Sequence, residues 1–162
     1  MQEPRKEGSG NWIPEEFFRR ITRVLPIVCV DLLVYNRKEE ILLLKRRNEP
    51  AKGEWWFPGG RVHFGETRLE AARRKLHDEC GVEIDSIVET GTFDCLLPVR
   101  KDLSHGVTTV FTVVAHSEGV AVDAQSTEFS WRSKAAWLRE LASKGDDWFP
   151  TKILKHSQVL PR

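Results

Sequence analysis

Residues 55–82, which read WWFPGGRVHFGETRLEAARRKLHDECGV, decide the fold of this chain. The aromatic start is typical of a short strand, and it ends in Pro58-Gly59-Gly60. The stretch Thr67-Arg68-Leu69-Glu70 has the form of a capping box, in which the threonine and glutamate side chains each accept from a backbone N–H. The sequence therefore predicts a strand, a glycine loop and a helix that begins near Thr67 and ends at Gly81.

The predicted helix has an apolar face and an acidic one. Residues at helical spacing form the apolar face, and these are Leu69, Ala72, Leu76 and Cys80. Lys75, Asp78 and Glu79 are three and four positions apart, so they project from neighbouring positions. Glu66 lies just before the cap and can point toward the same space. A solvated amphipathic helix would explain each of these acids singly, but it explains the whole pattern poorly.

Three carboxylates beside a glycine loop suit a hard divalent cation. Mg²⁺ and Mn²⁺ prefer oxygen ligands, and Gly59 and Gly60 allow the backbone to come close to such an ion. A cation held there would bridge the oxygens of a diphosphate and neutralise the charge of a leaving group. The sequence thus predicts a magnesium site at Glu66, Asp78 and Glu79, with manganese as the other candidate.

The flanking sequence predicts mainly strands, and the fold class is mixed α+β or α/β. We expect strands at 26–35, 41–44, 55–57, 87–98, 107–116 and 128–131, and helices at 14–22, 67–81, 134–142 and 147–158. The first two strands are expected to form a hairpin, and residues 99–106 a polar loop. Residues 1–11 are predicted to be a flexible tail, followed by a single domain over residues 12–162.

Composition narrows the class of protein. The chain has 162 residues, of which 40% are hydrophobic, enough for one core. It has 25 basic and 24 acidic residues, so no global field favours nucleic acid as a partner. Its three scattered cysteines indicate reduced thiols. Neither a membrane-spanning run nor a signal-peptide core is found, and we expect a cytoplasmic protein without a membrane partner.

The central segment resembles the Nudix box, whose pattern is G-x5-E-x7-R-E-U-x-E-E-x-G-U with U a bulky aliphatic residue. The matching positions are Gly60, Glu66, Arg74, Leu76, Glu79, Gly81 and Val82. The resemblance implies a Nudix α/β/α sandwich with a mixed central sheet flanked by helices. It also implies Mg²⁺-dependent hydrolysis of a nucleoside diphosphate linked to another moiety.

The resemblance also implies roles for individual residues. Glu66 and Glu79 would be catalytic and metal-binding acids, and Asp78 would be a shorter substitute for one of the paired glutamates. The carbonyl of Gly59 or Gly60 would complete the metal shell. Arg74 would orient an acid through a charge-assisted hydrogen bond.

Lys75 departs from the pattern, which has glutamate at this position. In many Nudix enzymes that glutamate helps to activate the attacking water, and a protonated lysine cannot act as a base. Three readings remain open: the site holds fewer metal ions, the base lies elsewhere, or the site is inactive.

One branch of the family, the GDP-mannose mannosyl hydrolases, also departs in this part of the box and attacks the sugar carbon. Residues 45–62, KRRNEPAKGEWWFPGGRV, resemble a segment of that branch. The resemblance implies that Arg46 and Arg61 contact the diphosphate. It also makes Gln125 a metal ligand, whereas the position of the branch's histidine base is Ser126.

Because serine has no basicity near neutral pH, the base must come from another residue. Glu128, His105 and His63 are the candidates. The sequence therefore predicts a hydrolase of a nucleotide sugar such as GDP-mannose. The alternatives are a pyrophosphohydrolase that attacks phosphorus and a nucleotide-binding or regulatory module. The expected partners are a small nucleotide and a second copy of the chain in a homodimer, with residues 14–22 as one candidate interface.

Overall fold

The computed structural model of the protein describes residues 12–121 and 125–158, so the tail predicted at residues 1–11 lies outside the described residues. Within these ranges seven strands form one sheet, with the order β3-β2-β1-β6-β5, while β4 pairs with β1 and β7 with β2. The strands are β1 (Ile27–Tyr35), β2 (Glu40–Arg46), β3 (Trp55–Trp56), β4 (Gly59–Arg61), β5 (Ile84–Val99), β6 (Asp102–Ala115) and β7 (Ser126–Ser133).

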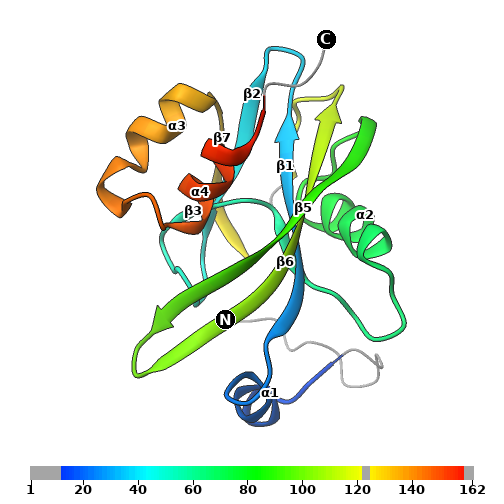
Figure 1. The fold of residues 1–162 in the computed structure, drawn as a ribbon. Helices are drawn as coiled ribbons and strands as arrows, with labels where there is room; N and C mark the ends of the chain where they lie inside the picture. Colours follow the sequence, from blue (N-terminus) through cyan, green and yellow to red (C-terminus); the bar gives the residue numbers. More distant parts are fainter. Residues whose placement is uncertain (1–11, 122–124, 159–162) are drawn as a thin grey trace.

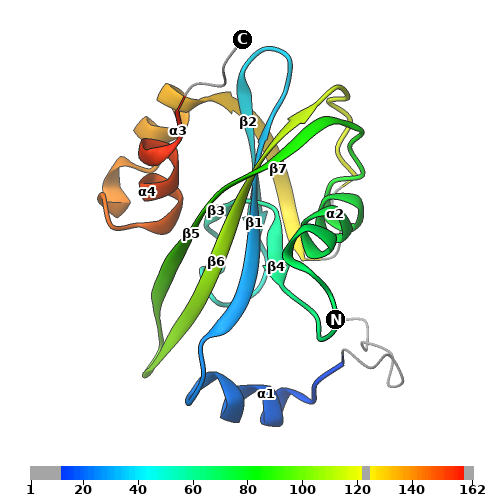
Figure 2. The same ribbon diagram turned by 45° about the vertical axis from the view of Figure 1, so that its right-hand side comes forward.

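Helices cover both faces of this sheet. They are α1 (Glu15–Thr22), α2 (Arg68–Glu79), α3 (Lys134–Glu140) and α4 (Phe149–His156), with a short 3₁₀ turn η1 (Ala142–Lys144) after α3. Figure 1 shows α2 on one side of the strands and α3 with α4 on the other. In Figure 2, α1 lies below the sheet at one end. The predicted α/β/α sandwich with a mixed sheet is confirmed.

Strand β1 explains why the core has two halves. Its residues alternate between the faces of the sheet. Val30, Leu32 and Val34 pack in the cluster beneath α2, while Leu33 and Tyr35 pack in the cluster beneath α3 and α4. A strand buried on both faces reads as the continuous apolar run seen in the sequence. Asp31, the one acid in that run, is therefore a buried carboxylate in the middle of the sheet.

The predicted β1–β2 hairpin is only partly formed. The two strands pair where Tyr35 faces Ile41, and beyond that point β1 takes other partners. It runs parallel to β6 over its whole length, and its first half pairs with β4, where Asp31 faces Gly59. Residues 59–61, expected as loop, thus form a short strand. Glycine allows this because its backbone can lie against β1 where a side chain would not fit.

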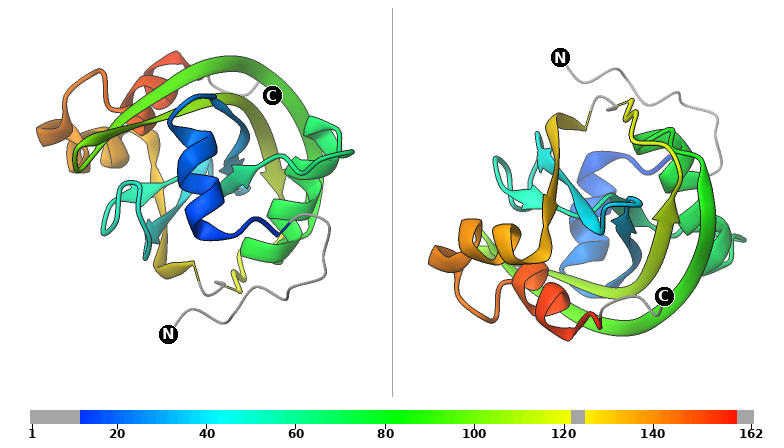
Figure 3. Two further views of the ribbon diagram at one scale, coloured as in Figure 1. Left: turned by 90° about the horizontal axis from the view of Figure 1, so that it is seen from below. Right: turned by 90° about the horizontal axis from the view of Figure 1, so that it is seen from above.

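The prediction of a polar loop at residues 99–106 is wrong. β5 continues to Val99 and β6 starts at Asp102, so only Arg100 and Lys101 form the turn. Arg100 has a φ of 54°, which is the conformation that tight hairpin turns require. Polar residues are tolerated here because the far end of the hairpin extends past the packed body of the sheet. Figure 3 shows how the long β5 and β6 strands curve around the central strands.

Candidate functional site

Helix α2 begins as the sequence predicts. Thr67 accepts a hydrogen bond from the backbone N–H of Glu70, and the Glu70 carboxylate accepts from the N–H of Thr67, which completes the capping box. The Glu70 pKa is lowered because its carboxylate accepts hydrogen bonds from the backbone N–H and the hydroxyl of Thr67. The cap fixes the direction in which the chain enters α2, and thereby the position of Glu66 next to it.

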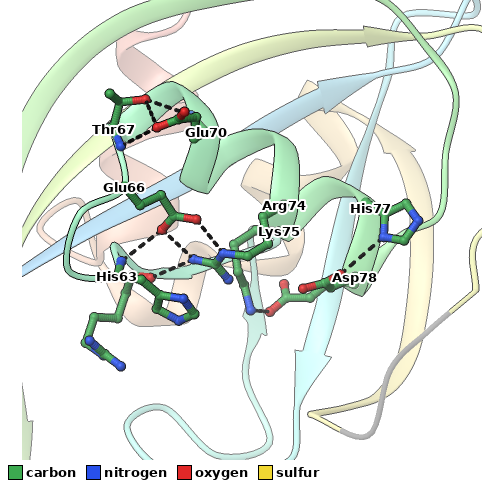
Figure 4. Close-up of polar contacts among 10 residues, drawn as sticks. His63, Glu66, Thr67, Glu70, Arg74, Lys75, His77 and Asp78 are labelled. Carbon is green, nitrogen blue, oxygen red and sulfur yellow. Dashed lines mark hydrogen bonds and ion pairs between the residues drawn. The ribbon is translucent and has the colours of Figure 1, made fainter. Parts of the chain in front are cut away.

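Glu66 is bound by Arg74, as Figure 4 shows. Arg74 Nε donates to Glu66 Oε1 over 2.6 Å and Nη2 donates to Oε2 over 2.9 Å, while the backbone N–H of His63 donates to Oε2 over 2.8 Å. The hydrogen bond from Arg74 is the main reason why the pKa of Glu66 falls to about 2. Arg74 thus holds both oxygens of the Glu66 carboxylate, and its role in catalysis stays a prediction.

Glu79 is paired with the residue that departs from the Nudix pattern. The Lys75 ammonium contacts Glu79 Oε1 one helical turn away, and the other oxygen, Oε2, accepts from the backbone N–H of Gly59 over 2.9 Å. Lys75 and Glu79 are only 7% and 5% exposed, so this is a buried ion pair. Glu79 thereby connects the end of α2 to the glycine strand β4.

The glycine strand lies very close to β1. A Cβ atom on Gly59 would lie 2.1 Å from Asp31 Oδ1 and 2.3 Å from the carbonyl oxygen of Val30, so no side chain fits there. A Cβ on Gly60 would lie 3.0 Å from Cε and 3.2 Å from Nζ of Lys75. Because they have no side chains, the two glycines let β1 approach β4 on one side and Lys75 on the other.

Asp78 lies apart from the other acids. Its carboxylate contacts Nδ1 of its neighbour His77 over 3.2 Å, and both side chains are exposed. Figure 4 places the two together at the end of α2. The predicted metal acids are therefore not equally placed, because Glu66 and Glu79 are turned inward and Asp78 lies at the surface.

A pocket brings together residues that lie far apart in the sequence. Arg46, Gly59, Glu79, Gln125 and Ser126 line it, along with Leu44, Asn48, Trp56 and Phe57. Arg46 Nε donates to the carbonyl of Pro50 over 2.6 Å, and its guanidinium lies over the Trp56 ring. Thus one predicted phosphate ligand and three predicted metal ligands line the same pocket.

Sequence reasoning did not single out Asp31, a buried acid beside the glycine strand. Its Oδ2 accepts a hydrogen bond of 3.3 Å from Trp56 Nε1, and it faces Gly59 across β1 and β4. Burial raises the pKa of Asp31 to about 8, and the charge of Arg46 opposes that rise. One signal was available, because an acid that interrupts an apolar strand needs a partner in the core.

The three candidate bases are not brought into this pocket. Lys45 Nζ binds Glu128 Oε1 over 2.6 Å, and His105 lies on β6 with Nε2 3.9 Å from Asp94. His63 lies beside Glu66, where burial and the charge of Arg74 lower its pKa.

A bulge in β7 separates Glu128 from Ser126. Lys45 faces Glu128 and Arg46 faces Ser126, with a register shift between the two pairs. Since neighbours along β2 point to opposite faces, Ser126 lies on the pocket side and Glu128 on the other. Arg61, the second predicted phosphate ligand, pairs with Cys29 through its backbone, and its carbonyl accepts from Arg74 over 3.1 Å.

The residues fit one divalent cation better than a cluster of ions. Among the described residues, no group of three or more histidine, cysteine or acidic side chains is assembled to hold a metal. Gly59, Glu79 and Gln125 nevertheless line one pocket, and a backbone carbonyl, a carboxylate and a side-chain amide offer the oxygen donors that Mg²⁺ and Mn²⁺ prefer. Glu66 lies in the loop just before α2, where Arg74 donates to both of its carboxylate oxygens.

The fold and the site together define a class of protein: an α/β/α domain whose pocket is lined by the glycine strand, one buried glutamate, a glutamine and an arginine. The chain belongs to the Nudix family, because residues 25–152 match the NUDIX domain. The expected enzyme class, a Nudix hydrolase, agrees with this membership. None of the helices in residues 12–121 and 125–158 has the length and apolar character that crossing a membrane requires.

Three relatives illustrate the range of the similarity. The low-salt glycan biosynthesis protein Agl8 of Haloferax volcanii is 32% identical over 120 residues, which cover 72% of this chain and 76% of that protein. An ADP-ribose pyrophosphatase of Methanocaldococcus jannaschii is 34% identical over 64% of this chain and 61% of its own length. The solved structure of a MutT protein from Methanosarcina mazei superposes with a TM-score of 0.59, at 26% identity over 72% of this chain and 83% of that one.

Proposed function

We propose that the protein hydrolyses a nucleotide sugar, such as GDP-mannose, to a nucleoside diphosphate and the free sugar. The observation that carries this proposal is the shared pocket of Arg46, Gly59, Glu79 and Gln125, next to a box that has lysine in place of the usual base. The similarity to a protein named for glycan biosynthesis supports a sugar-linked substrate. In this reaction a water oxygen forms a bond to the sugar carbon, and the bond between that carbon and the diphosphate oxygen breaks.

The pocket residues would have separate roles in this reaction. Arg46 would bind the diphosphate, since a guanidinium fork matches phosphate oxygens. Glu79, Gln125 and the carbonyl of Gly59 would hold a divalent cation, which neutralises charge on the leaving diphosphate. Ser126 lines the pocket where the resembling branch has its histidine, and none of the described residues lining it is a histidine. The residue that takes the proton from water therefore differs from that of the resembling branch.

A second candidate function is diphosphate cleavage at phosphorus. The relative named as an ADP-ribose pyrophosphatase favours it. Hydrolysis in water enriched with oxygen-18 separates the two reactions, because the label enters the sugar if carbon is attacked and a phosphate if phosphorus is attacked.

A third candidate is a nucleotide-binding or regulatory module, which the buried Lys75–Glu79 pair favours because it engages the central acid. A panel of nucleotide sugars, dinucleotides and ADP-ribose incubated with Mg²⁺ tests it. Tight binding of one compound without turnover of any would support the binding module and exclude the enzyme.

Glu79→Gln tests the assignment of the metal acid. We expect loss of Mg²⁺-dependent turnover with retained secondary structure by circular dichroism, because the amide keeps the shape but not the charge. Glu140→Gln is the control, since this exposed residue on α3 pairs with Arg132 away from the pocket. Full activity in Glu79→Gln would show that the metal site is assigned to the wrong residue.

We also propose that the protein works in the cytoplasm and as a homodimer. The three cysteines are free thiols in the structure, as a reducing compartment would keep them. Phe17 on α1 and the nearby Val24 and Leu25 are exposed apolar side chains, which supports this end of the molecule as the dimer contact. Light scattering at two concentrations tests the assembly, and a monomer mass at both would exclude it.

A further inference from the structure

Lys75 is held more tightly than a surface lysine. Its ammonium contacts Glu79 Oε1 and lies against the glycine strand, where a Cβ on Gly60 would be 3.2 Å from Nζ. Only 7% of the residue is exposed. The lysine therefore keeps a fixed positive charge inside the candidate metal site.

The two inward-facing glutamates of the box, Glu66 and Glu79, are each paired with a cation of the chain itself. Arg74 binds both oxygens of Glu66, and Lys75 binds one oxygen of Glu79. The remaining acid of the box, Asp78, contacts His77 at the exposed end of α2, as Figure 4 shows. With glutamate at position 75, as in the Nudix pattern, the site would instead carry two more units of negative charge.

We propose that Lys75 is an internal cation that competes with the divalent ion for Glu79 and limits the site to a single, weakly bound ion. The proposal rests on the proposed function only in taking Glu79 as a metal ligand. A divalent ion that binds Glu79 must either displace the ammonium from Oε1 or bind beside a positive charge. Both cost binding free energy, because like charges at contact distance repel strongly where water is excluded.

Lys75 is also a positioning residue for the same carboxylate. The ammonium engages Oε1 while the Gly59 N–H engages Oε2, so both oxygens are fixed before any ion arrives. Removing the lysine takes away the positive charge beside Oε1 and keeps the hydrogen bond from the Gly59 N–H to Oε2. The affinity for a divalent ion should then rise without loss of the carboxylate's place in the site.

The test is the binding of Mn²⁺ alone, without substrate, followed by the electron paramagnetic resonance signal of the free ion. We expect Lys75→Met to bind Mn²⁺ about tenfold more tightly than the natural protein, and Lys75→Glu to bind at least one more ion per chain. Arg73→Met is the matched control, because it removes a positive charge from an exposed position two residues earlier on the same helix. Its affinity should change by about twofold or less, since exposed charges are screened by salt.

Equal affinities in Lys75→Met and Arg73→Met would overturn the proposal. If Lys75→Met does not fold alone, Lys75→Gln provides a second variant. Folding of either variant only with Mn²⁺ supports the proposal, because the ion then replaces the ammonium. If both stay unfolded at saturating Mn²⁺, the proposal is wrong. The substrate panel is separate, so a chain that binds Mn²⁺ as expected but hydrolyses nothing would refute the proposed function alone.

Discussion

At the scale of single residues, the ion pair between Glu66 and Arg74 leads to a prediction about pH. The pKa of Glu66 is about 2 in the folded protein, below its ordinary value of 4.5, chiefly because Arg74 donates to it. A depressed pKa stabilises the fold above pH 4.5, and this contribution is lost as the pH falls toward 2. Arg74→Met should therefore lower the free energy of unfolding at pH 7 by about 1 to 2 kcal/mol, allowing for solvent screening of a partly exposed pair.

Urea unfolding at several pH values measures this effect. The difference between the natural protein and Arg74→Met should shrink steadily as the pH is lowered below 4.5. Arg73→Met, which changes an exposed neighbour, should show a small difference at every pH. A deficit in Arg74→Met that stays constant down to pH 3 would mean that Arg74 acts through packing and not through the Glu66 charge.

Gly59 gives a second prediction at the residue scale. Its missing Cβ makes room for Asp31 Oδ1 and the carbonyl of Val30, and both would lie closer than 2.5 Å to a methyl group. Gly59→Ala should lower the free energy of unfolding by about 3 kcal/mol, because β4 must move away from β1. Gly119→Ala is the control, since no atom lies within 4 Å of a Cβ there. Thermal unfolding of both variants measures the difference, and similar stabilities would contradict the close approach.

At the scale of elements, the capping box of α2 predicts a coupling between two side chains. Thr67→Ala should cost about 1 kcal/mol of stability, the usual value for a lost N-cap. The double variant with Glu70→Ala should lose less than the sum of the two single losses, because both side chains belong to one reciprocal set of hydrogen bonds. Ser133→Ala, which removes the N-cap of α3, is the control and should add to Thr67→Ala. Additive losses for Thr67 and Glu70 would refute the reciprocal box.

The elements also show what the sequence could predict. The start of α2 was predictable because the capping box is a local signal contained in four residues. The strand β4 was not, because its pairing depends on β1 approaching a glycine about thirty positions away. The hairpin turn at Arg100 was missed for a related reason: its polar residues resemble a loop, and only the pairing of Val99 with Asp102 makes them a turn.

The candidate site also contains residues that the sequence could predict and residues that it could not. The motif located Glu66, Arg74 and Glu79, and the structure places all three facing inward, although their roles stay predictions. The pairing of Lys75 with Glu79 follows from helical spacing, but its burial depends on the glycine strand that packs over it. The location of Glu128 could not be predicted, because a single bulge in β7 decides which face of the sheet it occupies.

At the scale of the whole molecule, metal binding should stabilise the fold, because the pocket joins strands β2, β4 and β7 to helix α2. An ion that binds the folded chain alone adds about 2.7 kcal/mol of stability at a hundred times its dissociation constant. For a domain of this size, we expect the melting temperature at such a saturating Mg²⁺ concentration to lie about 5 to 10 °C above that in EDTA. Glu79→Gln should show no rise, since it lacks the central charge. A rise of the same size in Glu79→Gln would place the stabilising ion elsewhere, and no rise in the natural protein would remove the metal from the proposed function.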